Sequence, residues 1–126
     1  TCGGDAQAVR YGQPVLAIEL MIAFLYDHVS RLNPMGIFGM VHVLEGTSVA
    51  IATTVAQQLK QGLGIPEKAM SYLSSHGELD KEHLAFFESL MNQVEKAEDR
   101  AAIIHSAKVV YQLYGDMLRG LMGQSQ

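Results

Sequence analysis

The chain has 126 residues, of which 48% are hydrophobic and 17% are charged, and its formal net charge is −4. This length and apolar content suffice to bury the core of one domain, and the single cysteine, Cys2, excludes an internal disulfide and favours a reducing, cytoplasmic compartment. The nine Lys and Arg residues are scattered, which excludes the basic patch that a nucleic-acid partner requires.

Polar residues interrupt the apolar runs near the start of the chain. Glu19, Asp27, His28, His42 and Glu45 keep every run below the roughly 20 apolar residues that span a bilayer, so we predict no membrane partner. Residues 1–12 have no periodic apolar face and do not resemble a signal peptide. We expect a flexible leader at 1–12, and further residues upstream because the chain does not begin with Met.

Helical periodicity begins at Pro14. Apolar residues recur at spacings of three and four up to Leu32, which predicts a helix that Asn33-Pro34 ends, because the residue before a proline avoids the α region. Residues 35–61 are the most hydrophobic stretch and predict one long or kinked helix. Its small residues permit close helix approach or a bend: Gly36, Gly39, Gly46, Ala50 and Ala52.

The second half of the chain predicts shorter helices. Gly62 to Gly64 ends the long helix, Pro66 begins the next, and residues 74–77 interrupt it. A further helix is predicted over 79–94, and a last one runs from a cap at Asp99 to about Leu121. We find no alternating strand pattern in the sequence. It therefore predicts an all-α bundle as a single domain over residues 13–122, with a disordered tail at 123–126.

One segment combines several groups that can bind a metal. His76, Asp80 and His83 lie within roughly 60° of one another on a helix, and two imidazoles with one carboxylate suit iron or manganese with open positions for oxygen and substrate. The alternative is structural: Asp80 caps the helix, His83 is partly exposed, and Glu78 and Glu82 form a solvated face. The spacing alone leaves both interpretations open.

Glu45 strengthens the metal interpretation because it lies within the apolar run 41–55, where an ionised carboxylate without a partner is expensive. A metal, a histidine or a hydrogen-bond network would compensate the cost of burying the Glu45 carboxylate. The alternative is a Glu that caps or reaches solvent at a kink by Gly46. His42, one turn earlier, and Glu19, among apolar residues of the first helix, are second-tier candidates, although a core histidine more often donates to a backbone carbonyl. His105 stands alone, and we interpret it as structural.

Three motifs together resemble a known family. They are VLEGTS at 43–48, SSHGELDKEH at 74–83 and YQLYGD at 111–116. They are similar to those of the haem-oxygenase-like, iron-containing redox enzymes, a family related in fold to thiaminase-type and PQQ-synthesis-type helical proteins. The resemblance covers about Pro14 to Leu121.

The resemblance implies a haem-oxygenase-like bundle in which carboxylates and histidines from several helices bind one or two irons. Better-known members activate oxygen to oxidise, cleave or desaturate small amino-acid-like or fatty substrates. Glu45 would match the family's middle-helix carboxylate, and His76 with Asp80, or Asp80 with His83, would match its late ligand pair. The usual late pair is an aspartate followed by a histidine one turn later, whereas here the four-residue step runs from His76 to Asp80.

Length is a second departure, because family members are usually nearly twice as long. The chain is thus expected to hold only the C-terminal part of the full fold or, if complete, one iron, a site shared across a dimer, or no metal. Our leading hypothesis is a mono- or di-iron, non-haem oxidase or oxygenase that acts with O2 on a small organic substrate, as a homodimer. The alternatives are a non-catalytic bundle that binds haem, another tetrapyrrole or a small molecule, and a dimerisation domain that has lost the metal site.

Overall fold

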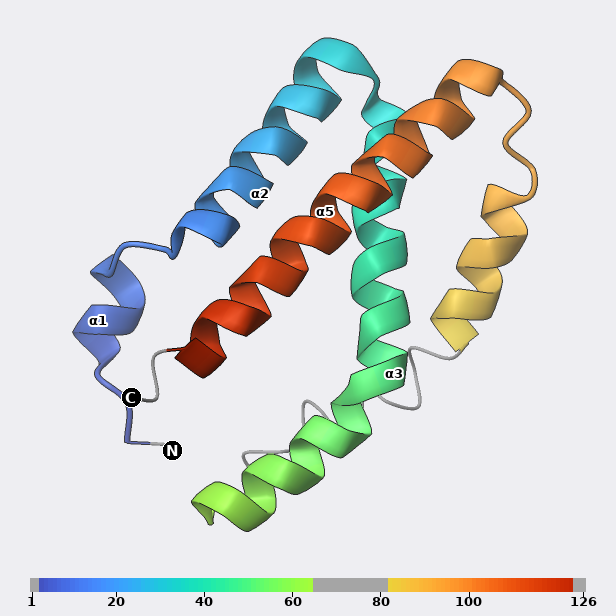
Figure 1. Cartoon of the computed structure of the whole chain (residues 1–126). Helices are drawn as coiled ribbons and strands as arrows, with labels where there is room; N and C mark the ends of the chain where they lie inside the picture. Colours follow the sequence, from blue (N-terminus) through green and yellow to red (C-terminus); the bar gives the residue numbers. More distant parts are fainter. Residues whose placement is uncertain (1–2, 65–81, 124–126) are drawn as a thin grey trace. The chain divides into compact units, whose positions relative to one another are not determined.

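The computed structural model describes residues 3–64 and 82–123, and within these ranges every regular element is a helix (Figure 1). The all-α class predicted from periodicity is confirmed. In chain order the elements are α1 (Ala6–Tyr11), α2 (Leu16–Asp27), the π-helical turn η1 (His28–Leu32), the 3-10 turn η2 (Pro34–Gly36), α3 (Ile37–Leu63), a helix over residues 82–91, and α5 (Ala97–Gly123). The helix predicted to begin at Pro66 falls outside the described residues.

A short helix, α1, lies where we predicted a flexible leader and no helix. The Asp5 carboxylate accepts hydrogen bonds from the backbone amides of Gln7, at 2.8 Å, and Ala8, at 3.3 Å, which satisfies donors at the helix start. None of the six residues of α1 is buried. Periodicity missed this helix because a cap, and not an apolar face, defines it.

The helix predicted up to Leu32 is present, but its last five residues have π-helical hydrogen bonding. Asn33 then takes an extended conformation before Pro34, and its side-chain oxygen accepts from the amide of Met35 at 2.9 Å. Its side-chain nitrogen donates to Asp99 Oδ1, also at 2.9 Å. We had predicted that Asp99 caps α5, and this is wrong. The helix begins at Ala97, so Asp99 lies in its first turn.

The chain divides into two compact units, and one of the boundaries between them falls within α3. The first, here called the α2–α5 unit, comprises Gln13–Val43 and Gln93–Gln126. The second, the α3 unit, comprises Thr1–Gly12 and Leu44–Asn92. The single domain proposed for residues 13–122 stays a prediction.

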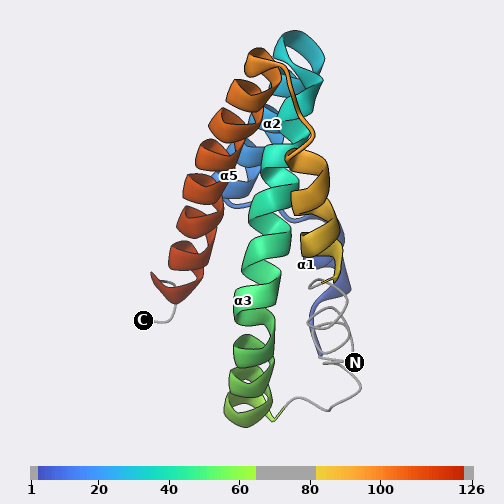
Figure 2. The same ribbon diagram turned by 90° about the vertical axis from the view of Figure 1, so that its right-hand side faces the viewer.

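The core of the α2–α5 unit forms where α2 runs along α5 and the first turns of α3 lie beside α5 (Figures 1 and 2). Leu25, Val43 and Val110 are buried, each from a different helix. Partly buried residues surround them: Met21, Phe24, Met40, Ala107 and Tyr114. Apolar side chains from α2, α3 and α5 thus meet in one cluster.

Much of the apolar surface of α2 is exposed, and Leu16 and Tyr26 are 69% and 74% accessible. By length and composition, the stretches Ala6–Leu32 and Pro34–Ile51 are apolar enough to cross a membrane, a test that core helices of soluble proteins also pass. The first stretch is not one continuous helix, because Gly12 and Val15 are extended. This break disfavours a membrane span, since a bilayer does not tolerate unpaired backbone groups. The absence of a membrane partner therefore remains a prediction.

Candidate metal centre

Glu45 occupies a position on α3 at which one carboxylate oxygen is shielded from water. Its Oε2 atom is buried and accepts no hydrogen bond from any residue that the structure describes. The hydroxyl of Thr47, two residues away, donates instead to the carbonyl of Leu44 at 3.2 Å. Burying a polar atom without a partner costs about 1–3 kcal/mol, and more for a charged group. The Oε2 atom is therefore free to bind a cation or accept from a donor that the described part of the chain does not supply.

The helix passes through Gly46 without a break, since α3 extends from Ile37 to Leu63. A Cβ atom at Gly46 would meet no atom within 4 Å, so this glycine is not needed for a close approach. Glu45 therefore caps no helix end, whereas the alternative of a Glu that reaches solvent stays a prediction, because this side chain is only partly buried.

The structure describes only the last two residues of the SSHGELDKEH motif at 74–83. His76 and Asp80 lie outside the described residues, as does Glu78. His83 is exposed on the helix over residues 82–91, and so is its neighbour Glu82, as the structural alternative also expects. Among residues 3–64 and 82–123, no group of three or more His, Cys, Asp or Glu side chains comes together as a metal site. The ligand set of Glu45, His76, Asp80 and His83 stays a prediction.

The second-tier candidates lie on different helices of the α2–α5 unit. Glu19 is exposed in the first turn of α2, where a carboxylate interacts favourably with the helix dipole. His42 is exposed at the edge of an open groove between α3 and α5, which it shares with three α5 residues, Ala107, Lys108 and Tyr111. Neither belongs to a group of three or more metal-binding side chains among the described residues.

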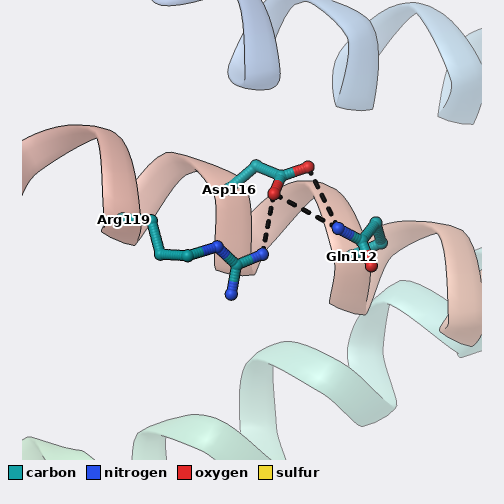
Figure 3. Close-up of polar contacts among 3 residues, drawn as sticks. All are labelled: Gln112, Asp116 and Arg119. Carbon is teal, nitrogen blue, oxygen red and sulfur yellow. Dashed lines mark hydrogen bonds and ion pairs between the residues drawn. The ribbon is translucent and has the colours of Figure 1, made fainter.

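The YQLYGD motif uses its acid within α5 itself. Asp116 accepts hydrogen bonds from Arg119 Nη2 at 2.7 Å and from Gln112 Nε2 at 3.2 Å (Figure 3). These bonds, that from Arg119 above all, hold the pKa of the Asp116 carboxyl below its usual range. Because its oxygens are engaged on the exposed surface of the helix, Asp116 is a helix-stabilising residue and not a candidate metal ligand.

Sequence reasoning missed a buried histidine in the α2–α5 unit. His28 is only 4% exposed, and neither of its ring nitrogens has a hydrogen-bond partner among the described residues. Its ring stacks on Phe24 with 5.3 Å between centroids and lies 5.8 Å from the ring of His105. The signal available in the sequence was the spacing of Phe24 and His28, one helical turn apart. That spacing could not predict the neighbouring ring of His105 on α5.

The comparison with known families agrees with the motifs. The sequence profile of a family described as iron-containing redox enzymes matches residues 1–115, which is most of the chain. The chain therefore belongs to the iron-containing redox enzymes with a haem-oxygenase-like fold, as the motifs predicted. No curated protein and no solved structure is significantly similar to it. Membership gives the chain an oxidoreductase class and an association with iron.

Proposed function

We propose that the chain carries ligands of a non-haem iron centre that oxidises a small organic substrate with O2. The ligands are Glu45, His76, Asp80 and His83, and the centre holds one or two ions. The observation that supports the proposal most is the buried, unpartnered Oε2 of Glu45, at the position where the resemblance implies a metal-binding carboxylate. A non-catalytic helix would gain stability by replacing this acid with an apolar residue.

The donor atoms suit the metal. Carboxylate oxygens and imidazole nitrogens without thiolates favour iron or manganese, and two histidines with one carboxylate leave positions open. Iron bound there would supply the redox chemistry and the open positions at which oxygen and substrate react. The protein's part is to hold the Glu45 carboxylate on a continuous helix and keep water from its Oε2, which strengthens its attraction to a cation.

Anaerobic titration with ferrous iron, followed by metal analysis, tests the proposal. We expect one or two irons per wild-type chain, affinity reduced at least about tenfold in Glu45→Gln, and oxygen uptake with substrate only in the iron-loaded wild type. Glu88→Gln is the matched control, because Glu88 is an exposed acid on the helix over residues 82–91. Equal iron binding by Glu45→Gln and the wild type would exclude Glu45 as a ligand.

A second candidate function is binding of a small apolar molecule without catalysis. An apolar pocket of about 410 Å³ lies between α2, η1 and the start of α3, within the size range of small-molecule sites. It is lined by Ile22, Leu25, Tyr26, Val29, Ser30, Ile37 and Met40. Haem titration separates the two functions, because a Soret band that shifts on mixing supports tetrapyrrole binding, whereas iron uptake without haem supports the oxidase.

We further propose that the protein works in the cytoplasm as a homodimer, without a nucleic-acid or membrane partner. The single cysteine and the net charge of −4 support this compartment and the absence of nucleic acid. Size-exclusion chromatography with light scattering tests the dimer, and a monomeric mass at micromolar concentration would contradict it.

A further inference from the structure

The His28 imidazole is held by apolar contacts, and its two ring nitrogens have no hydrogen-bond partner among the residues that the structure describes. Phe24 stacks on the ring, and a Cβ atom at Gly36 would clash with its Cδ2 and Nε2 edge, so Gly36 allows the ring to be buried there. Both ring nitrogens are inaccessible and unpartnered among the described residues. An imidazole placed in this way is unfavourable unless something binds its nitrogens.

His105 supplies a second imidazole from α5. Its ring centre lies 5.8 Å from that of His28, with 34° between the ring planes. Two imidazoles that share one ion, each nitrogen about 2 Å from the metal, have ring centres roughly 5–6 Å apart. The His105 side chain is exposed, so solvent reaches this side of the pair. The π-helical turn begins at His28, and such turns are frequent at functional sites.

We propose that His28 and His105 form a second metal site, within the α2–α5 unit, that binds a divalent ion of borderline softness such as Zn²⁺. Neutral imidazole is a common ligand of zinc, copper and nickel. No third His, Cys, Asp or Glu joins the pair among the described residues, so water or an external ligand completes the coordination. The site binds more weakly than a closed four-ligand zinc site. It shares no residue with the proposed iron ligands and does not depend on them.

Zinc titration by calorimetry tests the site in a full-length Glu45→Gln, Asp80→Asn background, which removes two proposed iron ligands. We expect about one Zn²⁺ per chain and an affinity at least about tenfold lower when His105→Gln is added. Ile104→Gln is the matched control, since it places the same side chain on the adjacent exposed position of α5 and should leave zinc binding unchanged.

Because His28 lies in the packed part of the unit, variants at this position risk unfolding. A second measurement therefore leaves both histidines unaltered. In the same background, the ring ¹⁵N resonances of His28 and His105 should shift together on adding Zn²⁺. Equal zinc affinity in the His105→Gln and Ile104→Gln proteins would overturn the site. Resonances that do not move would overturn it too. Neither result bears on iron binding through Glu45.

Discussion

Gly39 of α3 and Ala107 of α5 lie backbone to backbone. A Cβ atom at Gly39 would overlap the amide nitrogen of Ala107 and the carbonyl oxygen of Ile103, neither of which is a flexible group. Gly39 therefore sets the separation of the two helices, and with it the depth at which Val43 and Val110 are buried. The small residues of the long helix were expected to permit a close approach, and Gly39 is where this occurs.

Gly39→Ala should lower the free energy of unfolding, because α3 and α5 must separate to admit the methyl group. Overpacking of this kind typically costs 1–3 kcal/mol. Urea denaturation monitored by circular dichroism measures the change. Gly120→Ala is the control, since a Cβ there meets no atom within 4 Å and should be neutral or slightly stabilising through helix propensity. Equal stability of the two variants would contradict the close approach at Gly39.

Asn33 joins the end of the first long helix to the start of α5, so Asn33→Ala should destabilise the α2–α5 unit by about 1–2 kcal/mol. Asn33→Asp keeps the acceptor for the Met35 amide but removes the donor to Asp99 and places two acids together. It should therefore also destabilise, and Asp99→Asn should partly rescue it. A double-mutant cycle by urea denaturation measures the coupling, and strict additivity would show that the 2.9 Å bond contributes nothing.

Acid should weaken α5 through Asp116. The pKa of this carboxyl is lowered in the folded chain, chiefly by the hydrogen bond from Arg119, so its stabilising contribution is present above the unfolded pKa, near 3.9, and is lost as the pH falls through the folded value. Thermal melting between neutral pH and about pH 2 should show a shallower acid decline for Asp116→Asn. Arg119→Gln should reproduce that change. An acid profile identical to the wild type in both variants would contradict a stabilising role of the Asp116 carboxylate.

The sequence predicted the helices well wherever an apolar stripe or a proline defined them, as with α2, α3 and the stop at Asn33. It missed α1, whose only signal is the Asp5 cap, and the π-helical turn, because an α-helix and a π-helix share much of one apolar stripe. The burial of His28 depends on Gly36 and His105, contacts that no local pattern encodes. Glu45 could be identified because an acid in an apolar run is conspicuous, whereas assigning it to iron required the family motifs. His76 and Asp80 lie outside the described residues, and the ligand set of Glu45, His76, Asp80 and His83 stays a prediction.

The Glu45 carboxylate should destabilise the iron-free protein. Replacing Glu45 with Met keeps a side chain of similar length but removes the unpartnered Oε2, which should raise the free energy of unfolding of the iron-free protein by about 1–3 kcal/mol. Functional positions commonly show this exchange of stability for activity. Glu88→Met, at an exposed position, is the control for a general effect of adding an apolar side chain.

The most direct test is anaerobic thermal melting of the wild type and Glu45→Met, each with and without ferrous iron. We predict that iron raises the melting temperature of the wild type, because a ligand that binds only the folded state stabilises it. Glu45→Met should melt above the iron-free wild type and respond little to iron. An equal response to iron in both proteins, or a variant that melts well below the iron-free wild type, would contradict the assignment of Glu45 as a metal ligand.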